Sequence, residues 1–134
     1  MKPVIRLLIA LSILYLVPAA EARPLSWVGT GVQSERGMRP MRWTIRLAFD
    51  RDGNGRIAYP SLACGGSLTR LRVVGRVAEF RERIRYGRRI CVDNGTVKIV
   101  THGNRLSWRW TGEHTRFPGM RARATLLPLR HRLR

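Results

Sequence analysis

A two-residue alternation of apolar and polar side chains runs through most of this 134-residue sequence and constrains its fold more than any other feature. In RWTIRLAF, residues 42–49, tryptophan, isoleucine, leucine and phenylalanine occupy every second position. Successive side chains of a strand point to opposite faces, so this pattern is typical of a strand with one buried face. Similar apolar patterns mark further predicted strands at residues 25–33, 56–59, 66–74, 76–87, 89–92, 96–100, 105–110 and 120–129.

Turn signals separate these segments. Asp93-Asn94-Gly95 predicts a hairpin between RICV (89–92) and TVKIV (96–100), because asparagine and glycine tolerate positive φ. The segment at residues 66–74 alternates through Leu68 and then drifts, and we predict a bulge near Gly65-Gly66. About eight antiparallel strands with short connections usually close on themselves to remove their edges. We therefore expect an all-β fold, a single antiparallel up-and-down barrel with apolar side chains inside and arginine outside.

The first 22 residues have the features of a signal peptide. Lys2 and Arg6 precede an apolar run of 11 residues, Leu7–Val17, and Ala20-Glu21-Ala22 supplies the small residues of a cleavage site. The run is shorter than the roughly 20 residues of a membrane span. We expect an exported protein, periplasmic or extracellular, in which residues 23–134 form one domain ending in a frayed basic tail.

The two cysteines, Cys64 and Cys91, are the next constraint. In an exported chain an even pair is most simply a disulfide. A zinc site is a weaker alternative because no histidine lies near either cysteine, and a redox pair would normally be Cys-x-x-Cys.

The basic charge is extreme, at +18 from 26 basic and 8 acidic residues. Such a field attracts polyanions, but scattered arginine can also form an ordinary solvated surface. If a polyanion such as nucleic acid, lipopolysaccharide or another anionic surface binds, the outward residues of two strands are the predicted contacts: Arg81, Arg83, Arg85, Arg105 and Arg109.

Residues 59–68, YPSLACGGSL, resemble a motif of exported bacterial domains, Tyr-Pro-Ser-Leu-x-Cys-x-Gly. The later parts of that pattern also match, and the resemblance covers residues 27–127. The matching residues outside the first motif are Trp27, Gly29, Phe80, Glu82, Ile84, Gly87, Cys91, Gly95, Trp108 and Trp110. The resemblance implies a small calycin-like (lipocalin-like) barrel with the cysteine pair bonded, and it implies no catalytic residue.

Two acidic positions are candidate sites. Asp50, Asp52 and Asn54 have the spacing of an EF-hand calcium loop, but Ser61 stands where the bidentate carboxylate belongs, so we predict a hairpin turn and no metal site. Glu82 shares its parity with apolar neighbours and should point into the barrel. A buried carboxylate needs partners, and we expect an internal ion pair with arginine. The alternative is a polar anchor in a ligand cavity walled by Trp108 and Trp110.

No recognisable catalytic or cofactor motif is present, so we expect a non-enzymatic protein without a cofactor. The leading hypothesis is a module that binds a protein or envelope component, such as an inhibitor, through turns at residues 52–56 and 102–105. The alternatives are a polyanion binder and a lipocalin-like carrier of a small ligand.

Overall fold

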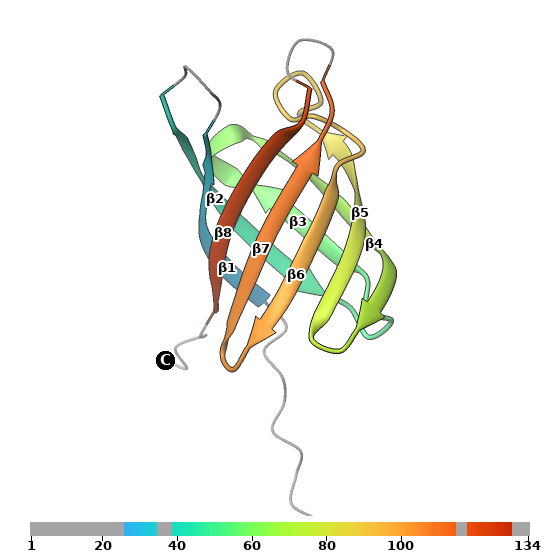
Figure 1. Cartoon of the computed structure of the whole chain (residues 1–134). Helices are drawn as coiled ribbons and strands as arrows, with labels where there is room; N and C mark the ends of the chain where they lie inside the picture. The colour runs from blue at the N-terminus through green and yellow to red at the C-terminus, as the bar shows by residue number, and fades with distance from the viewer. Residues whose placement is uncertain (1–25, 35–38, 115–117, 130–134) are drawn as a thin grey trace, which may run out of the picture.

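The protein forms a closed barrel of eight antiparallel strands (Figure 1). This computed structural model describes residues 26–34, 39–114 and 118–129. The strands are β1 (Ser26–Gln33), β2 (Met41–Phe49), β3 (Gly55–Tyr59), β4 (Cys64–Val74), β5 (Val77–Tyr86), β6 (Thr96–His102), β7 (Arg105–Gly112) and β8 (Met120–Pro128). Each strand pairs with the next in sequence, and β1 also pairs with β8. The predicted all-β, up-and-down architecture is confirmed.

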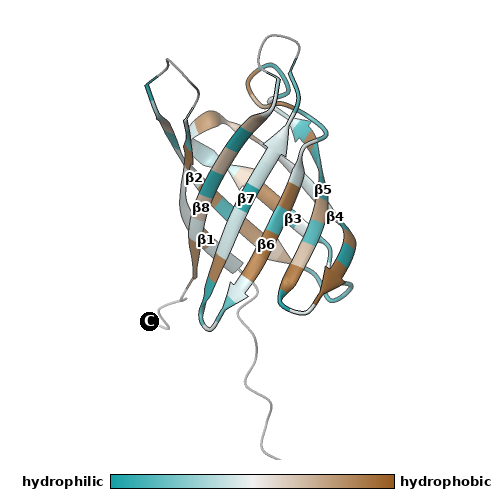
Figure 2. Ribbon diagram, viewed as in Figure 1, coloured by the Kyte–Doolittle hydropathy of each residue, from teal (hydrophilic) through white to brown (hydrophobic). Residues whose placement is uncertain are grey.

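The alternation of the sequence becomes the inside and outside of this barrel. Apolar and polar residues alternate along the strands in Figure 2, and the apolar ones form one continuous core. Three alternate residues in the middle of β2 are buried: Trp43, Ile45 and Leu47. Because the barrel is closed, each strand can place arginine in solvent while its other face excludes water.

Glycines form the predicted irregularity at the start of β4. The register of β4 against β5 shifts between Gly65 and Gly66, and again between Arg70 and Arg72. A Cβ atom at Gly66 would lie 1.8 Å from the carbonyl oxygen of Arg83. Only glycine allows the two backbones to approach this closely, so the predicted bulge is confirmed.

The predicted strand at residues 89–92 is wrong. β5 ends at Tyr86, and residues 87–95 form a loop before β6. Gly87 turns the chain with φ +72°, and its carbonyl oxygen accepts hydrogen bonds from the N–H groups of Ile90 and Cys91. The disulfide between Cys91 and Cys64, at the start of β4, is confirmed and draws the loop toward the core. The apolar residues of RICV therefore pack over one end of the barrel and do not extend the sheet.

The connections divide between the two ends of the barrel. One end, here called the upper end, carries the β1–β2, β3–β4, β5–β6 and β7–β8 connections, and the opposite end carries the other three (Figure 1). The β3–β4 connection includes a 3-10 turn, η1 (Pro60–Leu62). Nothing in the described ranges is a helix of the length and apolarity that crossing a bilayer requires. The predicted signal peptide (1–22) and most of the basic tail (130–134) lie outside the described residues.

Candidate functional site

An internal cavity opens at the upper end of the barrel. Its volume is about 220 Å³, and its lining is mainly apolar. The aromatic walls are Trp43 on β2, Tyr59 on β3, and Trp108 and Trp110 on β7. The residues nearer the connections are Met41, Leu62, Ile90, Val92 and Met120. The barrel interior is therefore incompletely filled at this end.

Glu82 lines this cavity and is 1% exposed, the one buried charged residue in the described part of the chain. Its carboxylate accepts a hydrogen bond of 2.5 Å from the Tyr59 hydroxyl and one of 3.0 Å from the Trp110 indole nitrogen. The inward direction predicted for Glu82 is confirmed. The expected arginine partner is wrong, because arginines occupy the outward positions on both sides of Glu82 and two aromatic donors already lie inside.

Burial controls the chemistry of this carboxyl. Removal from water raises the pKa of Glu82 to about 7, against the lowering effect of its hydrogen bonds from Tyr59 and Trp110; the charge of Asp93 adds to the rise. Burial also raises the pKa of Tyr59, and the neighbouring Glu82 charge and hydrogen bond add to that rise. With a pKa of about 7, the Glu82 carboxyl can be a hydrogen-bond donor or acceptor near neutral pH.

Trp108 also lines this cavity. It is 1% exposed, and its ring meets that of Tyr59 edge-on at a centroid distance of 6.3 Å. Its indole nitrogen is buried and has no hydrogen-bond partner among the described residues. A buried unsatisfied donor costs roughly 1–3 kcal/mol, so an acceptor supplied to this N–H would be held favourably.

The β5–β6 loop covers part of the cavity and is fixed from two sides. Cys91, bonded to Cys64, and its neighbours Ile90 and Val92 line the cavity. The backbone N–H of Glu82 donates to the carbonyl oxygen of Gly95 at 2.8 Å. The disulfide and this hydrogen bond hold the loop at both the start of β4 and the middle of β5.

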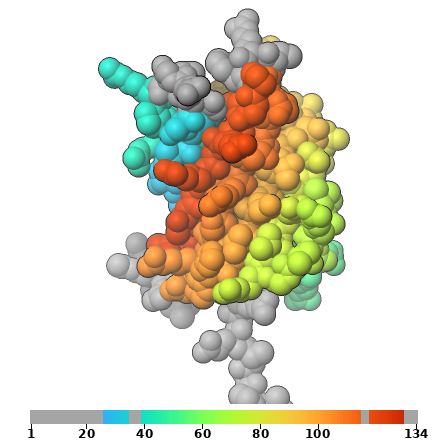
Figure 3. Space-filling model, in the orientation of Figure 1, coloured from blue at the N-terminus to red at the C-terminus, as the bar shows by residue number. Residues whose placement is uncertain are grey.

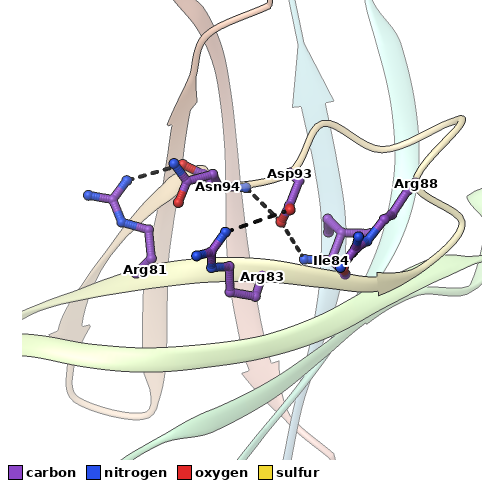
Figure 4. Close-up of polar contacts among 6 residues, drawn as sticks. All are labelled: Arg81, Arg83, Ile84, Arg88, Asp93 and Asn94. Carbon is purple, nitrogen blue, oxygen red and sulfur yellow. Dashed lines mark hydrogen bonds and ion pairs between the residues drawn. The ribbon is translucent and has the colours of Figure 1, made fainter.

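Asp93 supplies a third attachment of the loop (Figure 4). Its carboxylate accepts hydrogen bonds of 2.8 Å from the backbone N–H groups of Ile84 and Asn94, and it lies 3.9 Å from Arg83. The bond from Ile84 is the main reason that the pKa of Asp93 is lowered. Asp93, predicted to be part of a tight hairpin, instead caps the edge that β5 presents to the loop.

The structure separates the predicted polyanion residues into different places. Arg81 donates to the Asn94 carbonyl oxygen and the Thr96 hydroxyl, and Arg83 pairs with Asp93. Arg85 is near the upper end of β5, whereas Arg105 begins β7 at the opposite end. Arg109 faces other cations on β6 and β8. The five residues therefore do not form one patch.

The segment with calcium-loop spacing is the β2–β3 turn. One carboxylate oxygen of Asp50 accepts hydrogen bonds from the N–H groups of Asp52, at 2.9 Å, and Asn54, at 3.0 Å. The Asn54 side-chain oxygen accepts from the N–H of Arg70. Gly53 has φ +81°. The predicted turn is thus held by side-chain oxygens that accept hydrogen bonds from backbone N–H groups.

The sequence reasoning missed Tyr59, Trp43 and the loop residues as parts of the cavity. The inward position of Tyr59 could have been predicted, because its alternation with Ile57 places both side chains inside the barrel. The loop residues had none, since their position depends on the disulfide and on the termination of β5.

Comparisons with known proteins add little to this description. The sequence matches no family model, and no curated protein is similar enough to count as a relative. The resemblance to exported bacterial domains therefore stays a prediction. A crystal structure of Rv2717c from M. tuberculosis has 16% identity and a TM-score of 0.44, covering 80% of this chain and 94% of that chain. Similarity at this level indicates neither fold, family nor function.

Proposed function

We propose that this protein binds a small, uncharged, mainly apolar molecule inside the barrel, with one hydroxyl or carbonyl group placed beside Glu82 and Trp108. The observation that carries the proposal is the cavity of about 220 Å³, with four aromatic residues in its walls and a buried carboxyl in its lining. Of the three hypotheses from the sequence, this geometry favours the carrier of a small ligand.

The size of the cavity limits the ligand. An apolar protein cavity of about 150 Å³ is large enough for benzene, and dedicated pockets for larger ligands begin at about 300 Å³. A volume of about 220 Å³ suits a molecule of one or two fused rings, or a short branched chain. Such a ligand would be held chiefly by burial of apolar surface against tryptophan.

The polar atoms define the functional group and its charge. The Trp108 N–H lacks an acceptor among the described residues, and the Glu82 carboxyl can accept or donate at neutral pH. A ligand hydroxyl can bond to both the Trp108 N–H and the Glu82 carboxyl, and a ligand carbonyl can bond to the Trp108 N–H. An anionic group would be repelled by the ionised carboxylate, and burying any unpaired charge is costly.

Binding to a protein or envelope component, with an inhibitor as one form, stays a prediction. The turns proposed for it, residues 52–56 and 102–105, belong to the end of the barrel opposite the cavity. The absence of enzymatic activity is likewise a prediction, as is export to the periplasm or cell exterior. The disulfide is compatible with export.

Calorimetric titration with 2-naphthol and naphthalene tests the proposal, because these probes differ only in a hydroxyl group. We expect both to bind, and 2-naphthol to bind about fivefold more tightly, the effect of one hydrogen bond. Trp108→Phe should reduce that difference in affinity. Equal affinities in the native protein would contradict the polar part of the proposal.

A matched pair of variants locates the binding. Ala122 lines the cavity, whereas Ala48 is half-buried on the outward side of β2. Ala122→Leu should weaken 2-naphthol binding at least about tenfold by filling the cavity, and Ala48→Leu should leave it unchanged. Circular dichroism checks that both variants are folded. Equal binding by the two would place the probe on the outer surface and overturn the proposal.

A further inference from the structure

Strand register brings cations from separate parts of the chain into one row on the outside of the barrel. Lys98 on β6 lies directly opposite Arg109 on β7, and Arg109 lies directly opposite Arg123 on β8. Arg123 pairs with Val32 on β1, which pairs in turn with Arg42 on β2. We call Lys98, Arg109, Arg123 and Arg42 the cationic row.

Like charges directly opposite one another destabilise a sheet, so this row is costly to the fold. Acidic residues do little to offset the cost, because β5 alone among the eight strands carries any. Glu79 on β5 contacts Lys98 at 3.4 Å and also pairs with Arg72. Within the described residues no ion pair joins Arg109, Arg123 or Arg42 to an acid.

The row borders a groove on the outer surface. The groove, of about 520 Å³, is lined by Lys98, Arg109 and Arg123 together with Arg121, the hydroxyl-bearing Thr111 and one acidic residue, Glu79. β6, β7 and β8 lie side by side on the face shown in Figure 3. Guanidinium and hydroxyl donors are suited to phosphate oxygens, which accept two hydrogen bonds from one arginine in a forked geometry.

We propose that the cationic row binds a flexible, linear chain of phosphate groups that wraps across β6, β7, β8 and β1 to β2. The row crosses four of the eight steps between neighbouring strands, which is half of the barrel's circumference. A planar anionic membrane cannot contact Lys98 and Arg42 at once on such a curved surface, whereas a flexible chain can follow it. A single-stranded nucleic acid and inorganic polyphosphate share this chemistry.

The row differs from the arginine set predicted from the sequence. Arg109 belongs to both, but Arg123 and Arg42 were not among the predicted contacts. Neighbouring strands lie about 4.8 Å apart, so the cations form a track across the strands and not along one strand. This surface is outside the barrel and is independent of the internal cavity proposed above.

The test measures binding of the protein to a single-stranded oligothymidylate at several salt concentrations. Each phosphate contact adds about 0.7 to the slope of log affinity against log salt, and about fivefold to the affinity at 0.1 M salt. Arg109→Ser/Arg123→Ser should therefore weaken binding about 25-fold and lower the slope by about 1.4.

The charge-matched control is Arg46→Ser/Arg56→Ser, which removes two exposed cations from β2 and β3. It should weaken binding less than about threefold, because its effect acts only through the screened long-range field. Equal losses in the two double variants would show that net charge alone attracts the strand, and would overturn the proposal. Circular dichroism and thermal melts exclude loss of folding as the cause.

Two further measurements distinguish the ligand and its geometry. Arg42→Ser should weaken binding of long oligothymidylates but not of trinucleotides, because only a long chain reaches across the barrel. Competition by inorganic polyphosphate separates recognition of phosphate from recognition of bases. Binding to phosphatidylglycerol vesicles that depends on Arg109 and Arg123, with no such dependence for oligothymidylate, would contradict the proposal.

Discussion

At the residue scale, Glu82 shows how a carboxyl is accommodated in an apolar barrel. It lies 1% exposed, with the Tyr59 hydroxyl and the Trp110 indole as its donors. These two neutral donors compensate only part of the cost of desolvation, and the pKa of Glu82 remains raised to about 7. Because the raised pKa belongs to the folded state, the stability of the protein should depend on pH.

Stability should fall as the pH rises from about 4.5 to about 7. In that window the folded protein retains a proton on Glu82 that the unfolded chain, with an ordinary pKa of 4.5, has released. The expected loss in the free energy of unfolding is about 3 kcal/mol. Urea unfolding measured at both ends of the window checks it.

Glu82→Gln is the control for this pH dependence. It removes the titrating group and should make the stability nearly constant over the same window. The lowered pKa values of Asp93 and Glu79 act in the opposite sense, since their contributions are lost only as the pH falls below the ordinary carboxyl range. If the variant retains the full decline, another group is responsible.

At the element scale, the start of β4 depends on close contact between backbones. Gly66→Ala would place a Cβ atom 1.8 Å from the Arg83 carbonyl oxygen, so either strand must shift. We expect the free energy of unfolding, measured with urea, to fall by about 3 kcal/mol.

Gly75→Ala is the comparison for this substitution. Gly75 has φ +58° but open space around it. The cost there should be only about 1–2 kcal/mol, from the left-handed backbone alone. Equal costs at the two positions would show that contact with β5 is not decisive.

The β5–β6 loop is the second element whose position is set by tertiary contacts. Replacing the disulfide by Cys64→Ala/Cys91→Ala opens a link between residues 27 apart in sequence. In the chain-entropy model the free energy of unfolding falls by about 3.5 kcal/mol. 2-Naphthol binding should also weaken, because the loop residues that line the cavity are released. Retention of full affinity by the folded double variant would mean that Asp93 and the Gly95 hydrogen bond suffice to hold the loop.

At the scale of the molecule, the charge of +18 opposes compactness through self-repulsion. The melting temperature should therefore rise by several degrees as sodium chloride increases from about 0.02 to about 0.5 M. The melting temperature of the Arg109→Ser/Arg123→Ser variant should rise less with salt, because the like-charge pair between β7 and β8 is gone. A melting temperature that is independent of salt would contradict a destabilising role for these charges.

The sequence by itself determined the barrel and the inward direction of Glu82. It also favoured a disulfide between Cys64 and Cys91 over a zinc site or a redox pair. These follow from local rules, because a period of two assigns each residue to a face and a pair of cysteines in a chain expected to be exported has few other uses. The bulge at Gly65-Gly66 was also predictable, because glycines inside a strand pattern are typical of a bulge.

Only the tertiary structure decided what each face meets. Tyr59 and Trp110 became the partners of Glu82, in place of arginine, because closure of the sheet brings β3 and β7 to opposite sides of one interior. Residues 89–92 have a strand pattern but form a loop, because the chain turns at Gly87 and Cys91 is bonded to Cys64 on β4. Register likewise gathered Lys98, Arg109 and Arg123 from three strands, since alternation fixes the face of a residue but not its neighbour across the sheet.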